Sequence, residues 1–251
     1  MEFDAKRETQ RIIDFIQEYY YNNKVDGAII GISGGKDSAV VAALMTKALG
    51  KDNVIGVTMP CHTIASCKSD AQLVSDFYGF KLINFELTDI YESFKDELKK
   101  LGNFTEQDTV NSDINIKPRL RMLTLYYLAA LYSKIKGKPY LVIGTSNKSE
   151  LYVGYFTKGG DSVHDLAPIA DLTVAEVIKI GEYLQVPKQV LYKTPSDDLS
   201  SLTDEEKLGV TYQDIEKYMS DPNSVDKGVG SKIKKLHDAN QHKFNIPTYR
   251  R

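Results

Sequence analysis

The chain has 251 residues, of which 42% are hydrophobic and 26% are charged, and its formal net charge is −2. A chain of this length and composition can bury a full globular core without disulfides or a structural metal. The near-neutral charge argues against a protein that binds nucleic acid over an extended surface. No apolar stretch approaches the ~20 residues that cross a bilayer, and the charged start does not resemble a secretory signal. We therefore expect a cytoplasmic protein with no nucleic-acid or membrane partner.

The two cysteines, Cys61 and Cys67, are separated by five residues. This spacing fits neither a zinc site nor a thioredoxin-like motif, so we interpret them as ordinary thiols. The chain contains no internal repeat, no low-complexity block and no linker rich in proline, glycine and serine. We therefore expect a single domain that spans residues 1–251.

Hydrophobic periodicity and turn residues predict helices that alternate with strands. In chain order they predict a helix over 8–21, a strand over 28–32, a helix over 37–49, a strand over 53–59, a helix over 66–78, a strand over 80–87 and a helix over 89–101. Residues 103–115 are polar and aperiodic, which predicts a mobile loop. After it we expect a helix over 117–136 with Pro118 in its first turn, a strand over 139–144, helices over 174–184 and 211–219, and an irregular tail from 241.

This alternation predicts an α/β fold with a doubly wound parallel sheet. Right-handed connections between parallel strands place helices on both faces of such a sheet. Ligands of open parallel sheets bind at the carboxyl ends of the strands. We therefore look for functional residues in the loops that follow the predicted strands.

The most informative segment lies between the first predicted strand and the next helix. Its eight residues are Gly31, Ile32, Ser33, Gly34, Gly35, Lys36, Asp37 and Ser38. Glycines let the backbone turn sharply and approach a ligand, and the free N–H groups at a helix start attract anions. The two serine hydroxyls can donate to phosphate oxygens. The segment therefore predicts a phosphate-binding loop.

Two common phosphate motifs do not fit this loop. Only three residues separate Gly31 from Gly35, and Asp37 follows the lysine, so the loop is not a Walker A motif, and the G-x-G-x-x-G pattern is absent. An aspartate at this place repels phosphate unless a cation lies between them, which favours Asp37 as a Mg²⁺ ligand. The alternative is a simple strand-to-helix turn in which the helix dipole stabilises Asp37.

The loop sequence SGGKDS resembles the pyrophosphate loop (PP-loop) of the ATP-pyrophosphatase group of adenylating enzymes, which split ATP between its α and β phosphates. Later segments resemble the NAD synthetases of this group: NIKPRLRM at 115–122, GTSNKSE at 144–150, GYFTKGGD at 154–161, DLAP at 165–168, PSDDL at 195–199, and His242-Lys243. The resemblance spans residues 31–243. It implies an adenine-nucleotide α-hydrolase-like fold and an ammonia-dependent NAD synthetase.

The resemblance also implies a role for each matching residue. It puts the eight loop residues on the ATP phosphates, Thr145 and Ser196 on ATP, and Mg²⁺ on Asp37 and Glu150. It puts deamido-NAD, the nicotinate dinucleotide, against Arg119, Lys158, Asp165, His242 and Lys243. The plainer interpretation, an ordinary charge on a helix, a loop or the tail, applies to Glu150, Arg119, Lys158, Asp165, His242 and Lys243.

Two positions depart from the family pattern. Pro118 stands where alanine is usual, and an ATP-binding lysine that the family often has aligns with Val174. Lys179, about one and a half helical turns further on, and Lys36 in the loop are the candidates to supply the missing charge.

The chemistry implied by the resemblance is amidation through an acyl-adenylate. The pyridine carboxylate attacks the α phosphorus of ATP, pyrophosphate leaves, and ammonia then displaces AMP. The loop and the metal on Asp37 stabilise the leaving group, which makes Asp37 a catalytic candidate. Asp165 is the candidate that binds ammonium and accepts its proton.

Two other functions remain open. One is a different PP-loop adenylating enzyme, which aminates a nucleotide or thiolates tRNA; the other is an ATP-binding sensor without turnover. Paired metal carboxylates are needed less by a sensor than by an enzyme. The family is homodimeric, so the resemblance implies a homodimer. The tyrosine-rich first helix and the 117–136 helix are the predicted interface elements.

Overall fold

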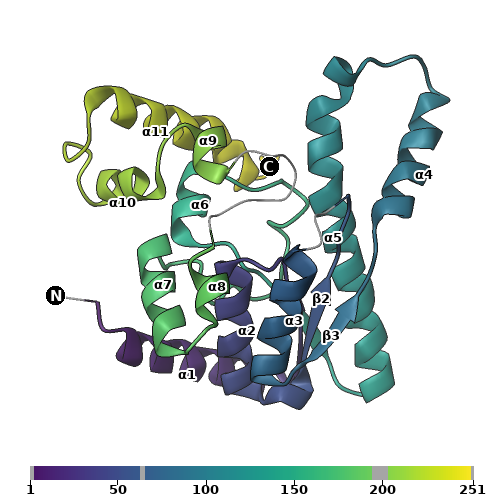
Figure 1. Cartoon of the computed structure of the whole chain (residues 1–251), viewed down its shortest axis with the longest axis vertical. Helices are drawn as coiled ribbons and strands as arrows, with labels where there is room; N and C mark the ends of the chain where they lie inside the picture. Colours follow the sequence, from purple (N-terminus) through teal and green to yellow (C-terminus); the bar gives the residue numbers. More distant parts are fainter. Residues whose placement is uncertain (1–2, 63–65, 194–202, 250–251) are drawn as a thin grey trace.

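The computed structural model describes residues 3–62, 66–193 and 203–249. Its centre is a parallel sheet of β1 (Gly27–Gly31), β2 (Val54–Thr58), β3 (Lys81–Asn84) and β4 (Tyr140–Ile143). The strands lie in the order β3-β2-β1-β4. Figure 1 shows β2 and β3 side by side. The chain winds outward from β1 to β3 and then returns to place β4 on the other side of β1. The topological switch point therefore lies between β1 and β4.

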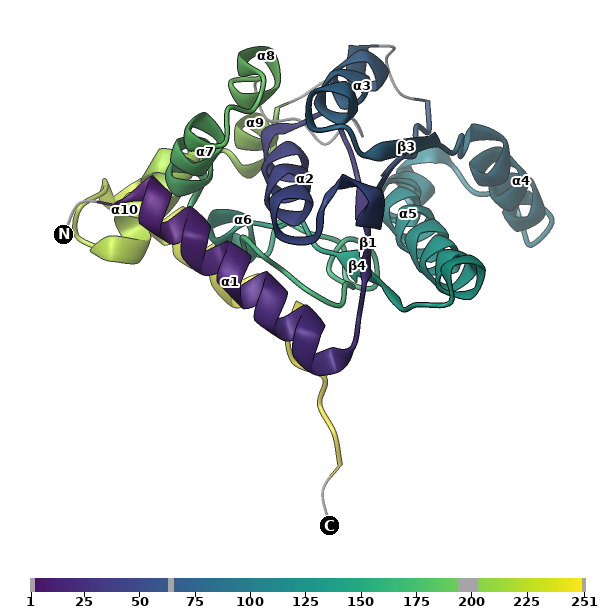
Figure 2. The same ribbon diagram turned by 90° about the horizontal axis from the view of Figure 1, so that it is seen from below.

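Helices cover both faces of this sheet (Figure 2). One face carries α1 (Ala5–Asn23), α2 (Lys36–Leu49), α3 (Ser66–Tyr78), α7 (Val174–Tyr183) and α8 (Lys188–Leu191), and the other carries α4 (Thr88–Lys99) and α5 (Glu106–Lys136). The alternating side chains of β1 separate the two cores. Ile30 packs with the α2 side, whereas Ile29 packs with the α5 side. The predicted doubly wound α/β fold is confirmed.

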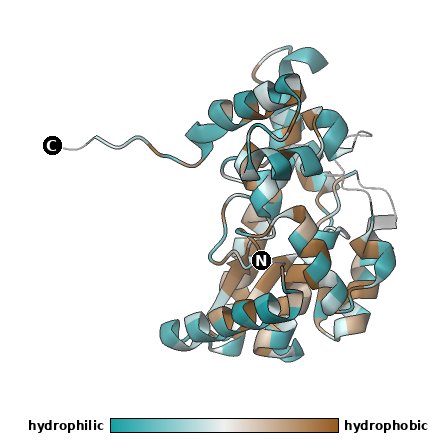
Figure 3. Ribbon diagram, turned by 90° about the vertical axis from the view of Figure 1, so that its left-hand side faces the viewer, coloured by the Kyte–Doolittle hydropathy of each residue, from teal (hydrophilic) through white to brown (hydrophobic). Residues whose placement is uncertain are grey.

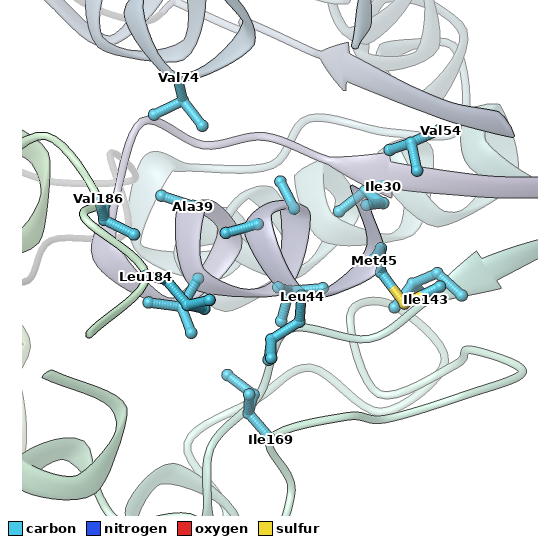
Figure 4. Packing of buried hydrophobic residues seen from close by; sticks show 14 of the residues in the cluster. Ile30, Ala39, Leu44, Met45, Val54, Val74, Ile143, Ile169, Leu184 and Val186 are labelled. Carbon is cyan, nitrogen blue, oxygen red and sulfur yellow. The ribbon is translucent and has the colours of Figure 1, made fainter. Parts of the chain in front are cut away.

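Helix α2 lies deepest in the molecule. All its residues from Ser38 to Met45 are buried, because small and apolar side chains follow one another without a polar face. A helix that is apolar all round can only be stable in the interior. Figure 4 shows Ala39, Leu44 and Met45 among side chains from the sheet and from the 169–186 region. The start of α2 is thereby held rigidly against β1.

A smaller layer stands above the carboxyl ends of the strands (Figure 1). It consists of α6 (Lys148–Val153), α9 (Asp204–Leu208), α10 (Tyr212–Ser220), α11 (Lys227–Asn240) and the 3₁₀ turn η2 (Gln241–Lys243). Its own apolar cluster includes Val153, Val174, Leu208, Tyr212 and Ile233. The outward faces of these helices are hydrophilic, and the tail after η2 extends away from the body (Figure 3).

The predicted loop at 103–115 is wrong, because α5 begins at Glu106. Thr105 and Asp108 form a capping box, in which the Thr105 N–H donates to Asp108 Oδ2 at 2.8 Å and the Asp108 N–H to Thr105 Oγ1 at 3.3 Å. These bonds satisfy N–H groups that a helix start otherwise leaves open. Pro118 consequently lies in the interior of the helix, not in its first turn as predicted, and removes one helical hydrogen bond there.

The predicted elements that are present differ from the prediction mainly at their ends, and strand β3 stops at Asn84, which is three residues earlier than expected. Four of the described helices, α6, α8, α9 and α11, have no counterpart in the prediction. A 3₁₀ turn, η1 (Lys51–Asn53), joins α2 to β2. Within the described ranges, no helix is both long enough and apolar enough to cross a membrane.

Candidate active site

A cavity of about 610 Å³ opens at the carboxyl ends of the strands, above the switch point. Its walls come from the β1–α2 loop, the end of β2, α5, the β4–α6 loop, residues 153–164, and the smaller layer of helices. Of the residues that the sequence indicates, the cavity is lined by the eight of the phosphate loop, Thr145, Glu150 and Lys243. The predicted ATP residue Ser196 lies outside the described residues.

The phosphate loop is held by its own serines. The Gly35 N–H donates to Ser33 Oγ at 3.2 Å, and the Ser38 hydroxyl donates to the Gly35 carbonyl at 3.1 Å. Gly34 has a φ of 84°, a left-handed conformation that glycine adopts without strain. No described side chain caps the start of α2. The loop therefore offers backbone N–H groups at a helix N-terminus, which is an arrangement that binds anions.

The two predicted metal carboxylates are joined by one amide. Asn147 caps α6, and its Nδ2 donates to Asp37 Oδ1 at 3.2 Å. The Asn147 N–H donates to Glu150 Oε2 at 3.1 Å, and the Glu150 N–H returns a bond of 3.0 Å to Asn147 Oδ1. Because β1 and β4 are neighbours in the sheet, the helices that follow them start side by side. The fold thus brings Asp37 and Glu150 together from positions more than a hundred residues apart.

Both carboxylates suit a hard cation. Burial raises the pKa of Glu150 well above its ordinary value, and the charge of Asp37 raises it further, whereas Lys36 acts in the opposite direction. A pair that repels in this way is stabilised by a divalent ion. Among the described residues, no group of three His, Cys, Asp or Glu is arranged to hold a metal. Two carboxylates fit Mg²⁺, which usually takes its remaining ligands from substrate phosphates and water.

Lys36 is the lysine that the structure brings to this site. Its ammonium lies 3.0 Å from Asp37 Oδ2 and only 5% of the residue is exposed. The ammonium of Lys179 instead lies over the ring of Phe3, 5.9 Å from its centre, and Lys179 does not line the cavity. Val174 is buried in the apolar cluster of the smaller layer. Lys36 and Lys179 are the two candidates to supply the charge that Val174 lacks. Of these two, Lys36 therefore lies in the site and Lys179 does not.

The residues predicted to contact deamido-NAD gather around the loop that follows α6. The Arg119 guanidinium donates to the Lys158 carbonyl at 3.3 and 3.2 Å, and the Lys158 ammonium donates to the His242 carbonyl at 2.8 Å. The Lys243 ammonium donates to the carbonyls of Gly154 and Phe156 at 2.7 and 2.8 Å. Lys243 lines the cavity, whereas Arg119, Lys158 and His242 lie outside its lining. The charged groups of Arg119, Lys158 and Lys243 thus all donate hydrogen bonds to backbone carbonyls at the margin of the site.

Both carboxylate oxygens of Asp165, the predicted general base, accept hydrogen bonds from other residues of the fold. Its Oδ2 accepts from the Val142 N–H at 2.8 Å and its Oδ1 accepts from the Tyr126 hydroxyl at 3.1 Å. Asp165 does not line the cavity, so its predicted role stays a prediction. The carboxylate of this loop that does line the cavity is Asp161, which accepts from the Thr157 N–H at 2.9 Å. Desolvation by the surrounding protein raises the pKa of Asp161, although its side chain reaches solvent.

The chain is similar to known proteins both in sequence and in fold. A family model described as NAD synthase matches residues 8–247. The NH(3)-dependent NAD(+) synthetase of Carboxydothermus hydrogenoformans is 37% identical over 98% of both chains, and that of Methanococcoides burtonii is 41% identical over 83% of this chain and 76% of its own. Among solved structures, an NMN synthetase from Francisella tularensis matches with a TM-score of 0.87 and 31% identity over 99% of both chains. The NH3-dependent NAD synthetase of Campylobacter jejuni matches with a TM-score of 0.79 and 30% identity over 100% of both. The chain therefore belongs to the NAD synthase family.

Proposed function

We propose that the chain is an ammonia-dependent NAD synthetase, a ligase that amidates deamido-NAD and forms NAD, AMP and pyrophosphate from ATP. The observation that carries this proposal is the phosphate loop with Asp37 and Glu150 joined across the switch point by Asn147. Phosphates bound by the loop N–H groups would lie beside the two carboxylates. Membership of the NAD synthase family supports ATP as the co-substrate, and a relative matched over 98% of its length is named as an ammonia-dependent enzyme.

The ATP site in this proposal follows the loop. The eight residues from Gly31 to Ser38, together with Thr145 and Ser196, hold the nucleotide, and Asp37 and Glu150 hold Mg²⁺. When bound there, Mg²⁺ supplies positive charge against the pyrophosphate that leaves. The loop N–H groups and the two serine hydroxyls donate to the same leaving group, where charge develops in the transition state. The chain thus lowers the barrier to breaking the bond between the α and β phosphates.

The acid that reacts is bound by the cations around the loop after α6. Arg119, Lys158, His242 and Lys243 are the proposed contacts to deamido-NAD. The present partners of the Arg119, Lys158 and Lys243 side chains are backbone carbonyls, which a ligand's phosphate oxygens can replace with a stronger, charge-assisted bond. By fixing the pyridine carboxylate beside the α phosphorus, these residues align two anions that otherwise repel each other.

The second half of the reaction needs ammonia as a neutral nucleophile. Ammonium must therefore lose a proton in the site, and a carboxylate of the loop after α6 is the proposed acceptor. Asp165 is the acceptor that the sequence indicates, and Asp161 is the alternative that lines the cavity. A raised pKa brings Asp161 closer to the working pH, which makes a carboxylate a more effective base.

The decisive experiment measures pyrophosphate release from ATP. We expect release only when deamido-NAD and Mg²⁺ are both present, and repeated turnover, with NAD and AMP formed in equal amounts, only when ammonium is added. Release of ADP, or turnover that requires tRNA or a nucleotide acceptor, would replace the proposal with another PP-loop activity. ATP binding without turnover would identify a sensor.

A second candidate substrate is nicotinate mononucleotide, which carries the same pyridine carboxylate without the adenylate half. The specific observation in its favour is the match to the NMN synthetase from Francisella tularensis over 99% of both chains. The two functions differ in the ratio of kcat/KM for the two acids. A ratio that favours deamido-NAD supports the first proposal, and one that favours the mononucleotide replaces it with the second.

The chain is also proposed to act as a single domain, as a homodimer, in the cytoplasm and without nucleic acid. Support for the dimer comes from an exposed apolar row on α5, at the i, i+4 spacing of one helix face: Leu123, Tyr127, Leu131 and Ile135. Within α1, Tyr20 is buried and bonds to the Gly27 carbonyl, whereas Tyr21 is exposed. Sedimentation equilibrium at micromolar concentration tests the dimer, and a monomer would remove it.

A further inference from the structure

Lys36 is a charged side chain buried at the edge of the proposed ATP site. It is the first residue of α2, it is 5% exposed, and its ammonium lies 3.0 Å from Asp37 Oδ2. Lysine is almost never buried to this extent unless its charge is paired. The surroundings of Lys36 must therefore supply compensating negative charge.

Three carboxylates supply that charge. Burial lowers the pKa of Lys36, but Asp37, Glu150 and Asp204 together raise it above its ordinary value, so the side chain stays an ammonium. Asp204, itself 6% exposed, accepts from the hydroxyls of Tyr155 at 3.1 Å and Tyr212 at 3.4 Å. The ring of Tyr212 also faces the ammonium, 5.8 Å from the ring centre.

This ammonium uses an oxygen that a metal ion needs. Asp37 Oδ2 is bonded to Lys36 and Asp37 Oδ1 to the amide of Asn147. A divalent cation that arrives alone must displace the ammonium and leave it buried without that partner, which is unfavourable. ATP changes this balance, because its phosphate oxygens offer the ammonium new partners of high charge.

We propose that Lys36 is a resident counter-ion, which keeps divalent cations off Asp37 and Glu150 until ATP provides another partner for its ammonium. This inference rests on the proposed function, because that function places the metal on the two carboxylates. Lys36 is then a positioning residue that couples binding of the metal to binding of the nucleotide. Its consequence is that the site rejects a free metal ion and accepts the metal together with ATP.

Manganese binding to the nucleotide-free chain tests the inference directly. Free Mn²⁺ is measured by electron paramagnetic resonance during titration of wild type, Lys36→Met, and Lys47→Met at an exposed position of the same helix. We expect weak and equal binding by wild type and Lys47→Met. Lys36→Met should bind Mn²⁺ about tenfold more tightly, because a like charge beside the dication is gone. Equal affinities of wild type and Lys36→Met would overturn the proposal.

Further variants separate charge from side-chain shape. Lys36→Arg keeps the positive charge and should bind Mn²⁺ as weakly as wild type, whereas tight binding by Lys36→Arg would count against a counter-ion. Adding Asp37→Asn to Lys36→Met should abolish the gain, because it removes the proposed ligand. If Lys36→Met does not fold, Lys36→Gln removes the charge but keeps a donor to Asp37, and the same gain is expected of it.

The outcomes also distinguish this inference from the proposed function. Pyrophosphate release with deamido-NAD and with the mononucleotide is measured on the same preparations. If wild type releases none and Lys36→Met alone binds Mn²⁺ tightly, the proposed function fails and the counter-ion stands. If wild type is active but its Mn²⁺ affinity equals that of Lys36→Met, the counter-ion fails and the function stands.

Discussion

The phosphate side and the substrate side of the cavity are held by different kinds of contact. On the phosphate side, Asp37, Asn147 and Glu150 bond to one another through side chains at two helix starts that are fixed on neighbouring strands. On the substrate side, Arg119 and Lys158 are exposed and end on backbone carbonyls of a loop and of η2. Groups fixed on rigid elements are preorganised for one ligand, whereas exposed cations exchange their partners at little cost. We infer that the phosphate side is fixed for adenylation, and that the substrate side adapts to the acid.

The largest effect is expected on the phosphate side. Asp37→Asn removes a charge that the metal and pyrophosphate need, so kcat/KM for pyrophosphate release should fall by about 10²–10³-fold. The loss should appear with deamido-NAD and with nicotinate mononucleotide alike, because both acids share the adenylation step. Steady-state kinetics with each acid measure it.

The matched control for that variant is Asp171→Asn, at an aspartate whose side chain is 96% exposed. It should retain wild-type kinetics. A loss in Asp37→Asn that depends on which acid is used would contradict the division of the cavity into a shared side and an adaptable side.

The next effect tests the proton acceptor in the loop after α6. If Asp165 is the base, Asp165→Asn should slow amidation by about a hundredfold and leave substrate affinity unchanged, while Asp161→Asn stays active. If Asp161 is the base, the effects reverse. Because the pKa of Asp161 is raised, the wild-type rate should then fall as pH decreases through that raised value. Rates at saturating ammonium across the pH range distinguish the two.

Retention of full ammonia turnover by both single variants would remove the loop carboxylates from the chemistry. Asp165→Asn has a second expected readout, because Asp165 accepts from the Val142 N–H and the Tyr126 hydroxyl. If Asp165→Asn lowers the free energy of unfolding by more than it raises the activation free energy of amidation, Asp165 is a structural residue that supports the margin of the site.

A smaller effect is expected from Arg119→Ala on the substrate side. The KM for the acid should rise about tenfold while the KM for ATP stays constant, since the guanidinium lies outside the cavity lining and its present partner is a carbonyl. Arg11→Ala, at an exposed position on α1, is the control. A rise in the KM for ATP would show that the two sides are not separate.

The sequence predicts the phosphate side well because its signals are local. The strand, the glycine bend and the helix follow one another within residues 27–49, so the loop's place at the edge of the sheet can be inferred without tertiary information. Gly144 to Glu150 repeats the same order of strand, turn and helix. The two local predictions place Asp37 and Glu150 at the same edge of the sheet, and the pairing of β1 with β4 in the structure brings them side by side.

What the sequence does not predict depends on contacts between distant residues or on short capping patterns. The start of α5 depends on a capping box at Thr105, which is hidden in a polar stretch without periodicity. Helix α11 carries Gly228 and Gly230 in its first turns, and these lower its helix propensity.

The orientation of Asp161 toward the cavity and of Asp165 away from it is set by loop geometry, which spacing alone does not encode. The burial of Lys36 depends on Asp204 and Tyr212, far along the chain.

The smallest effect concerns stability and distinguishes the two sides most directly. Because the pKa of Glu150 is raised, the folded chain without ligand holds this proton more tightly than the unfolded chain does. Below pH 4.5, the ordinary pKa of a glutamate, the carboxyl is protonated in both states and does not destabilise the fold. Above the raised pKa it is charged in both states, and burying that charge destabilises the folded chain. The free energy of unfolding therefore falls as the pH rises from 4.5 to the raised pKa. Glu150→Gln cannot ionise, and its amide oxygen can still accept from the Asn147 N–H. It should be more stable than wild type by about 1 kcal/mol at alkaline pH, and equal to it in acid.

Urea unfolding of ligand-free protein across pH measures this difference. Glu176→Gln is the control, because Glu176 occupies the same capping position with Thr173 in α7 and lies outside the cavity lining. If Glu150→Gln gains stability, Glu176→Gln does not, and Glu150→Gln also loses pyrophosphate release, then the phosphate side maintains a repulsion between Asp37 and Glu150 that only its ligands relieve. A variant less stable than wild type at alkaline pH would instead make the carboxylate a net support of the fold. The phosphate side would then resemble the substrate side, where Arg119, Lys158 and Lys243 already have carbonyl partners without ligand.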